Sequence, residues 1–209
     1  MSKKSAPSKK EELLQKATEL FRTQGFHATS VDDVCAATGV TKGTFFHYFK
    51  SKEALAQACL EEWKCMVAQM EQHAPFMKER DPLKKVLRYL DFFLSAVSHP
   101  DQIQSCLAGT VVQEVWDTHP NLKNAANACF TASGDHFAKL LKDAAKHYGK
   151  TVDAKALSDL YLATFQGSLI LYKGSGDIRV FRRNFGLLKS FIRSLFAEAP
   201  SRRKSPRRT

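Results

Sequence analysis

The chain has 209 residues, of which 44% are hydrophobic, and this is enough to bury a core in one or two domains. Its net charge of +11 favours an anionic partner. No charge-free apolar run approaches the roughly 18 residues that span a bilayer, and the start, Met1 to Lys4, lacks the apolar region of a secretory signal. The five cysteines form no C-x-x-C pair, so they argue against a structural zinc site and favour a reducing cytoplasm.

The positive charge is densest at the C-terminus. Residues 201–209 hold five Lys or Arg and no acid, whereas residues 1–64 hold ten Lys or Arg and eight Asp or Glu. Such a run is typical of a disordered basic tail, which we place at 198–209. It would add salt-sensitive affinity for DNA, although a solubilising role is the simpler explanation. Residues 1–9, rich in Lys and Ser, are predicted to form a flexible basic arm.

The first helix is predicted from about Lys10 to Gln24, and Gly25 ends it. Ser30 and Asp33 form the Ser-x-x-Asp signal that starts a second helix. Gly39 ends this helix, because glycine adopts the left-handed conformation most easily.

A third helix follows at once, with Thr41 as its cap and with Phe45 and Phe49 four residues apart on its inner face. Two short helices joined by a short turn that contains glycine form a unit known for reading DNA. From Thr41 to Lys52 the chain has three lysines and no acid, which suits a surface that faces phosphates and bases. The pattern alone is equally typical of a solvated basic face on an ordinary helical hairpin.

Several segments between residues 25 and 55 match a known family in register. They are Gly25-Phe26, Thr29-Ser30-Val31, Thr38 to Thr44, His47-Tyr48-Phe49 and Ser51 to Leu55. With these segments the chain resembles the DNA-binding domain of TetR-family repressors over roughly Glu11 to Trp63. The resemblance implies a helical homodimer that represses transcription and responds to a small molecule. Phe46 departs from the family pattern, in which a tyrosine hydroxyl commonly bonds to a phosphate.

The resemblance implies that the third helix enters the major groove of a double-stranded DNA operator. Lys42 and Thr44 are expected to reach base edges, since lysine suits guanine and threonine suits several bases. Gly43 would let the backbone approach the phosphates. The remaining contacts are expected to fix the register on phosphates, and they come from Ser30, Thr41, His47, Tyr48 and Lys52. We place the DNA-binding domain at residues 10–52.

Residues 53–197 are predicted to form a helical regulatory and dimerisation domain. Ser51 caps its first helix, residues 53–74, which connects the two domains. Later helices are expected to start at Asp81-Pro82, Asp101, Asn121 and Asp153 and after Gly174-Ser175-Gly176. No segment alternates with a period of two, so the fold is predicted to be all-α with about nine helices.

The last two helices are more apolar and aromatic than a monomer surface requires. With the same helices of a second copy they would form a four-helix bundle, and the homodimer would space two reading helices about 34–36 Å apart, one turn of DNA. The residues expected at this interface are Leu157, Tyr161, Phe165, Phe181, Phe185, Leu188 and Phe191. The alternative is that both helices pack only within their own subunit.

A helical body rich in aromatic residues can hold a ligand cavity between its helices. The residues expected to line it are Phe92, Phe93, Cys106, Gln113, Trp116, Phe130, His136, Phe137, Phe165, Gln166 and Tyr172. For each aromatic residue a place in the plain core is the alternative. The partner is expected to be a small-molecule inducer, which the sequence does not identify.

Cys106 has a second interpretation. The run Gln104 to Gly109 resembles the helix start of a TetR subgroup that includes electrophile- and oxidant-responsive regulators. That resemblance brings Lys173 near the cysteine, where an ammonium would lower the thiol pKa and make the thiolate available. An inert buried cysteine explains the sequence at least as well.

The sequence as a whole predicts a ligand-responsive repressor that binds a palindromic operator. An enzyme is not expected, because the chain has no nucleophile–base motif, no glycine-rich phosphate loop and no His-x-x-Glu-His metal set. No cofactor is predicted. Three alternatives stay open: the thiol sensor, an activator, and an architectural protein that binds DNA without sequence preference through its basic tails.

Overall fold

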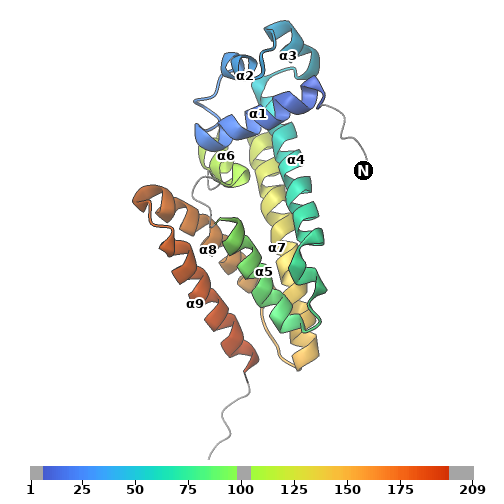
Figure 1. The fold of residues 1–209 in the computed structure, drawn as a ribbon, viewed down its shortest axis with the longest axis vertical. Coiled ribbons are helices and arrows are strands. Elements are labelled where there is room, and N and C mark those ends of the chain that lie inside the picture. Colours follow the sequence, from blue (N-terminus) through green and yellow to red (C-terminus); the bar gives the residue numbers. More distant parts are fainter. Residues whose placement is uncertain (1–6, 98–104, 198–209) are drawn as a thin grey trace, which may run out of the picture.

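The computed structural model describes residues 7–97 and 105–197. Within these ranges the chain forms nine α-helices, one 3-10 turn and no strand, which confirms the predicted all-α fold. Helices α1 (Lys9–Thr23), α2 (Val31–Thr38) and α3 (Lys42–Tyr48) form a small head at one end of the molecule (Figure 1). Helix α4 (Lys52–His73) runs from this head along the body.

The body is arranged around its longest helix, α7 (Pro120–Tyr148), which contacts α4, α5 (Pro82–Ala96), α6 (Leu107–Val115) and α8 (Ala154–Ser175). The last helix, α9 (Arg179–Phe196), packs on α8 and α5, and the 3-10 turn η1 (Pro75–Lys78) joins α4 to α5. None of the helices in the described ranges combines the length and the apolar character needed to cross a bilayer.

Local hydrogen bonds set the helix starts that the sequence predicts. The Ser30 hydroxyl accepts from the Asp33 N–H at 3.1 Å, and the Asp33 carboxylate accepts from the Ser30 N–H at 2.8 Å. This reciprocal capping box satisfies two N–H groups that the first turn of α2 leaves free. The side chains of the other predicted caps accept from the first turns of α3, α4, α5 and α8, and they are Thr41, Ser51, Asp81 and Asp153.

Other predicted boundaries change. Helix α7 begins at Pro120 with His119 at the cap position, so the predicted cap at Asn121 is wrong. Proline is favoured at the first helical position, where its missing N–H leaves no bond unmade. The start predicted at Asp101 lies outside the described residues, and so do the basic tail at 198–209 and most of the arm at 1–9.

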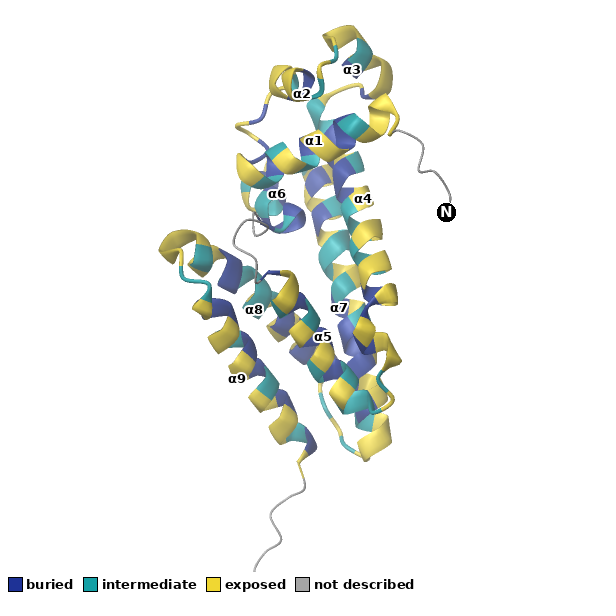
Figure 2. Cartoon of the chain, viewed as in Figure 1, coloured by how far each residue is buried: buried dark blue, intermediate teal, exposed yellow. Residues whose placement is uncertain are grey.

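The buried apolar side chains gather in two clusters. One fills the body between α5, α7, α8 and α9. The other joins α1, α2, α3 and the start of α4 to α6 and the start of α7, through residues such as Phe21, Phe45, Leu55, Val111 and Leu122. Figure 2 shows that the buried side of α6 faces this junction. The core of the head therefore extends past residue 52 into α6 and α7.

Two glycines with positive φ provide a matched test of the junction. Gly39, at φ 65°, has open space around it, whereas a Cβ at Gly25, at φ 95°, would lie 2.2 Å from Oε1 of Glu114 in α6. Gly39→Ala is expected to lower the free energy of unfolding by about 1–2 kcal/mol, the cost of a left-handed conformation. Gly25→Ala is expected to lower it further, because Glu114 must also move. Denaturant unfolding measures both losses of free energy. Equal losses would show that the contact with Glu114 does not contribute to stability.

Candidate nucleic-acid interface and ligand cavity

Helix α3 presents an exposed polar surface at the end of the head (Figure 2). Lys42, His47 and Tyr48 are exposed, and Thr44 is half-buried. Phe45 lies fully inside the head, as its spacing predicts. The residues predicted to contact DNA from this helix therefore share one outward face.

Lys42 and Thr44 on this face bond to neighbouring side chains of the head. Lys42 Nζ lies 2.9 Å from a carboxylate oxygen of Asp32 in α2, but the two side chains are 62% and 67% exposed. An ion pair with this exposure contributes little, so the ammonium can exchange Asp32 for a phosphate or a base. The Thr44 hydroxyl lies 3.1 Å from the Thr41 hydroxyl, which also accepts from the Thr44 N–H at 3.2 Å.

Two other residues of the head, Ser30 and Phe46, have little to offer a phosphate. The Ser30 hydroxyl donates to Asp33 at 2.7 Å and accepts from the same residue, so the capping box already uses its donor. Phe46 exposes 52% of its surface and supplies only hydrocarbon at the place where the family pattern has a phenol.

Lys52 makes contacts that the sequence does not predict. Its ammonium donates to the carbonyls of Phe26 and Thr29, each at 2.8 Å, and lies 4.3 Å from the centroid of the Phe26 ring. Burial lowers the pKa of this ammonium. Lys52 therefore holds the loop between α1 and α2.

A set of long-range hydrogen bonds joins this loop to α6. The Glu114 carboxylate accepts from the N–H groups of Phe26 at 3.2 Å and His27 at 2.8 Å. At the end of α1, Arg22 Nε donates to the Ser105 carbonyl at 2.8 Å, and the Ser105 hydroxyl donates to the Arg22 carbonyl at 2.7 Å. These partners are more than 80 positions apart in the chain, and no local signal in the sequence predicts them.

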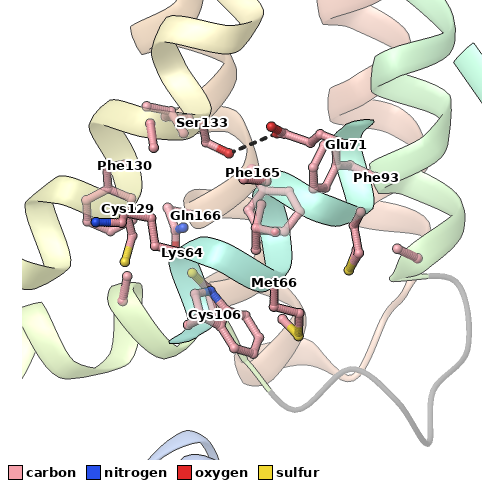
Figure 3. Close-up of a pocket in the computed structure, with 18 of the residues that line it drawn as sticks. Lys64, Met66, Glu71, Phe93, Cys106, Cys129, Phe130, Ser133, Phe165 and Gln166 are labelled. Carbon is pink, nitrogen blue, oxygen red and sulfur yellow. Dashed lines mark hydrogen bonds between the residues drawn. The ribbon is translucent and has the colours of Figure 1, made fainter. Parts of the chain in front are cut away.

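A cavity of about 390 Å³ lies below this junction, with walls from α4, α5, α6, α7 and α8 and with Arg22 of α1 at its edge. Most of its lining is apolar. Of the residues predicted to line it, Phe93, Cys106, Phe130, Phe165 and Gln166 do so, and Figure 3 shows them around the cavity. The volume is within the range of small-molecule sites in proteins.

The other residues predicted for the cavity lie elsewhere. Phe137 is fully buried in the core, and Trp116 is 64% exposed at the end of α6. Gln113 donates to the Gly109 carbonyl of its own helix. Phe92 and Tyr172 pack against the body core without reaching the cavity. These corrections share one cause, since periodicity places a residue on the inner side of a helix but does not tell core from cavity.

A buried acid that the sequence analysis missed lies in the cavity wall. Glu71 of α4 is 3% exposed. Its Oε1 accepts from the Tyr89 hydroxyl at 2.8 Å and from the Ser133 hydroxyl at 3.2 Å, and its Oε2 lies 2.6 Å from His136 Nδ1. Figure 3 shows the bond from Ser133. His136, predicted to meet a ligand, is thus turned to Glu71 and does not line the cavity.

The surroundings of Cys106 differ from the prediction. Arg22 lines the same cavity, and burial lowers the pKa of its guanidinium. Lys173 is exposed near the end of α8 and does not line the cavity. A second cysteine in the wall, Cys129, donates to the Leu60 carbonyl at 3.4 Å, and burial raises the pKa of its thiol to about 12.

The predicted dimer interface is also corrected. Five of its seven residues are buried inside the subunit, so they have no surface to offer a second copy, and they are Leu157, Tyr161, Phe181, Phe185 and Leu188. Phe165 lines the cavity, and Phe191 is exposed. The outer face of α8 and α9 forms an open groove whose exposed apolar residues are Leu160, Leu171, Leu187 and Phe191.

Comparisons with known sequences identify both parts of the chain. The sequence profile described as "Bacterial regulatory proteins, tetR family" matches residues 13–59, and the profile "Transcriptional regulator LmrA/YxaF-like, C-terminal domain" matches residues 82–184. A helix-turn-helix regulator from the lacX 3' region of Lactococcus lactis subsp. lactis is 26% identical over 185 residues, 87% of this chain and 91% of that protein. The repressor DhaR of Mycobacterium sp. strain GP1 is 24% identical over 166 residues, 78% of this chain and 82% of DhaR.

Solved structures have the same fold. A TetR transcriptional regulator from Chloroflexus aurantiacus superposes with a TM-score of 0.79 at 24% identity, over 88% of this chain and 94% of that one. The reduced form of NemR from Escherichia coli superposes with a TM-score of 0.76 at 22% identity, over 88% of this chain and 96% of NemR.

Removing the charge of Lys52 should lower the stability of the protein more than removing the charge of Lys42. Lys52→Met is expected to lower the free energy of unfolding by roughly 1–3 kcal/mol, because two loop carbonyls lose their donor. Lys42→Met, at an exposed ion pair, is expected to change it by less than about 1 kcal/mol. Denaturant unfolding of the two variants tests this, and an unaltered stability of Lys52→Met would contradict the role of Lys52 in the loop.

Proposed function

The chain belongs to the TetR family of transcriptional regulators, and on this premise we propose that it is a ligand-responsive repressor that binds a palindromic operator as a homodimer. It is a helix-turn-helix DNA-binding regulator and not an enzyme, as its relatives are regulators. One observation carries the proposal: α6 lines the cavity on one side and bonds to the DNA-binding head on the other. We assign it to the cytoplasm, where its DNA would be.

In the proposed complex α3 lies in the major groove. Lys42 and Thr44 contact base edges, and the absence of a side chain at Gly43 lets the helix approach the backbone. Thr41, His47 and Tyr48 contact phosphates. Ser30 contributes through its cap to α2, and Phe46 can pack on a thymine methyl group but cannot bond to a phosphate.

Release follows from the position of α6. A ligand that fills the cavity favours one placement of α6 and α4, and the head moves with them because Glu114 and Ser105 bond to it. A ligand shifts such an equilibrium only by its difference in affinity for the two states. In the dimer this shift would change the spacing of the two α3 helices and so separate them from the two halves of the operator.

Operator binding is the first test. Fluorescence anisotropy with the DNA just upstream of the gene should give an affinity on the order of a thousandfold above that for scrambled DNA of equal length. Thr44→Ala and Lys42→Ala should abolish most of this preference, whereas Thr131→Ala, on an exposed site of α7, should not.

Equal affinity for both DNAs, falling steeply with salt, would favour the architectural alternative. Repeating the assay with the chain cut after Pro200, against a library of genomic fragments, separates binding by the tail from an operator at another locus. Transcription in vitro from the bound promoter then decides between repression and activation.

The exposed groove of α8 and α9 is the proposed dimer interface. Leu187 is 71% exposed and Phe191 is 47% exposed, and pairing with a second copy would remove this apolar surface from water. The double variant Leu187→Glu/Phe191→Glu is expected to sediment as a monomer at concentrations where the parent chain is a dimer. Met77→Glu, at an exposed apolar residue outside the groove, is the control. Identical sedimentation of all three proteins would place the interface elsewhere.

A second candidate, a thiol-based sensor, is favoured by one observation: Cys106 lines the cavity beside the positive charge of Arg22. A quinone that enters the cavity would be attacked by the thiolate: a carbon–sulfur bond forms as the ring C=C bond opens toward a carbonyl oxygen, which takes a proton from water. The hydrogen on the attacked carbon then moves to the second oxygen and leaves a thioether-linked hydroquinone. Benzoquinone is then expected to release DNA from the parent chain and from Cys65→Ser, which removes an exposed cysteine, but not from Cys106→Ser. Equal release from all three would remove Cys106 as the sensor.

A further inference from the structure

The cavity wall contains a positive side chain, Arg22, and a buried acid, Glu71, and we propose that the cavity selects an amphipathic acid whose anionic group is bound by Arg22. The ligand class is thus a carboxylate or sulfonate on an apolar body. The proposal deepens the proposed function, on which it rests in taking this cavity as the effector site.

Arg22 has the geometry of an anion-binding residue. It lies in the last turn of α1, lines the cavity and places its guanidinium carbon 4.9 Å from the centroid of the Trp63 ring. Its Nε donates to the Ser105 carbonyl. Within residues 7–97 and 105–197, no carboxylate forms an ion pair with it, and its two terminal nitrogens have no hydrogen-bond partner. These nitrogens can form the paired, charge-assisted bonds that arginine makes with carboxylates and other oxyanions.

The second cation in the cavity wall, Lys64, already has an ion-pair partner. Lys64 Nζ lies 2.8 Å from the Glu61 carboxylate on the same helix. Glu19, one turn earlier on α1, acts electrostatically on Arg22, but its carboxylate forms its ion pair with Lys16. Among the described residues of the wall, Arg22 is therefore the cation without an ion-pair partner. Because the guanidinium is partly removed from water, an anion from the ligand would be held there more strongly than at the surface.

Glu71 fixes the direction of the ligand. It follows Trp63 by eight positions on α4, which corresponds to about 12 Å along a helix axis. Its oxygens face Tyr89, Ser133 and His136, so an anion near Glu71 would meet like charge and find those donors in use. Figure 3 shows Glu71 and Ser133 on the opposite side of the cavity from Cys106. The anionic group must therefore point to Arg22.

The space between the two ends suits the apolar body of such a ligand. Phe93, Phe130 and Phe165 line it, and the volume of about 390 Å³ is within the range of small-molecule sites. Since Arg22 also bonds to Ser105, two residues before α6, an anion that draws the guanidinium away acts directly on the bond between α1 and the segment that leads into α6. Ligand recognition and the release of the head would thus use the same side chain.

A matched pair of fluorescent probes tests the proposal. 1-Anilinonaphthalene-8-sulfonate and N-phenyl-1-naphthylamine share one apolar body and differ by the sulfonate. The full chain is expected to bind the sulfonate about tenfold or more tightly, the contribution of a charge-assisted hydrogen bond. Arg22→Met should lose this preference and keep its affinity for the naphthylamine, which also reports that the cavity is intact. Lys64→Met, at the paired cation, should keep the preference.

The outcomes that overturn the proposal are specific. They are equal affinity of the parent chain for both probes, and an unchanged preference in Arg22→Met, which would indicate sulfonate binding at other cations. If Arg22→Met does not fold, the parent chain still gives an answer, since its sulfonate affinity must fall with added salt while its naphthylamine affinity does not. The titrations contain no DNA, so a failure of operator binding leaves their result unaffected and is recognised separately.

Discussion

The loop from residue 25 to residue 29 is held from two directions, and the rest of the structure depends on it. Its N–H groups at Phe26 and His27 donate to Glu114 of α6, and its carbonyls at Phe26 and Thr29 accept from Lys52 of α4. Backbone polar groups that leave water need partners, and here the partners belong to two different helices. The head therefore keeps its position only while α4 and α6 keep theirs.

The apolar core also fixes the head against the body. The cluster that packs the three head helices also contains Leu107 and Val111 of α6 and Leu122 of α7, so the head is not a separate body on a flexible stalk. Close-packed interiors move between discrete arrangements and do not deform continuously. A displacement of α6 at the cavity thus reaches α3 through packed side chains as well as through hydrogen bonds. No long pathway is needed, because α6 lines the cavity and also bonds to the loop between α1 and α2.

The features that the sequence predicts are local ones. The capping box at Ser30, the cap at Thr41 and the left-handed Gly39 depend on residues within a few positions, and the structure has each of them. The features that it does not predict depend on distant partners. Lys52 has the composition of a phosphate ligand but bonds to a loop some 25 positions earlier, and Leu188 lies inside the subunit although the adjacent Leu187 is exposed. Periodicity identifies two apolar faces on α8 and α9 and cannot assign one to the core.

The stability of the protein does not explain why Glu71 and Arg22 lie in the cavity wall. A buried acid such as Glu71 requires several donors to offset its loss of water, and apolar residues of similar volume would often be as stable. Arg22 adds a cation whose terminal nitrogens lack a protein acceptor in the described residues. Two such groups contribute little to the stability of the protein, but in the proposed complex they would distinguish the two ends of a bound molecule. Because Arg22 also bonds to Ser105, two residues before α6, the side chain proposed to bind the ligand would also be the one whose displacement loosens the head.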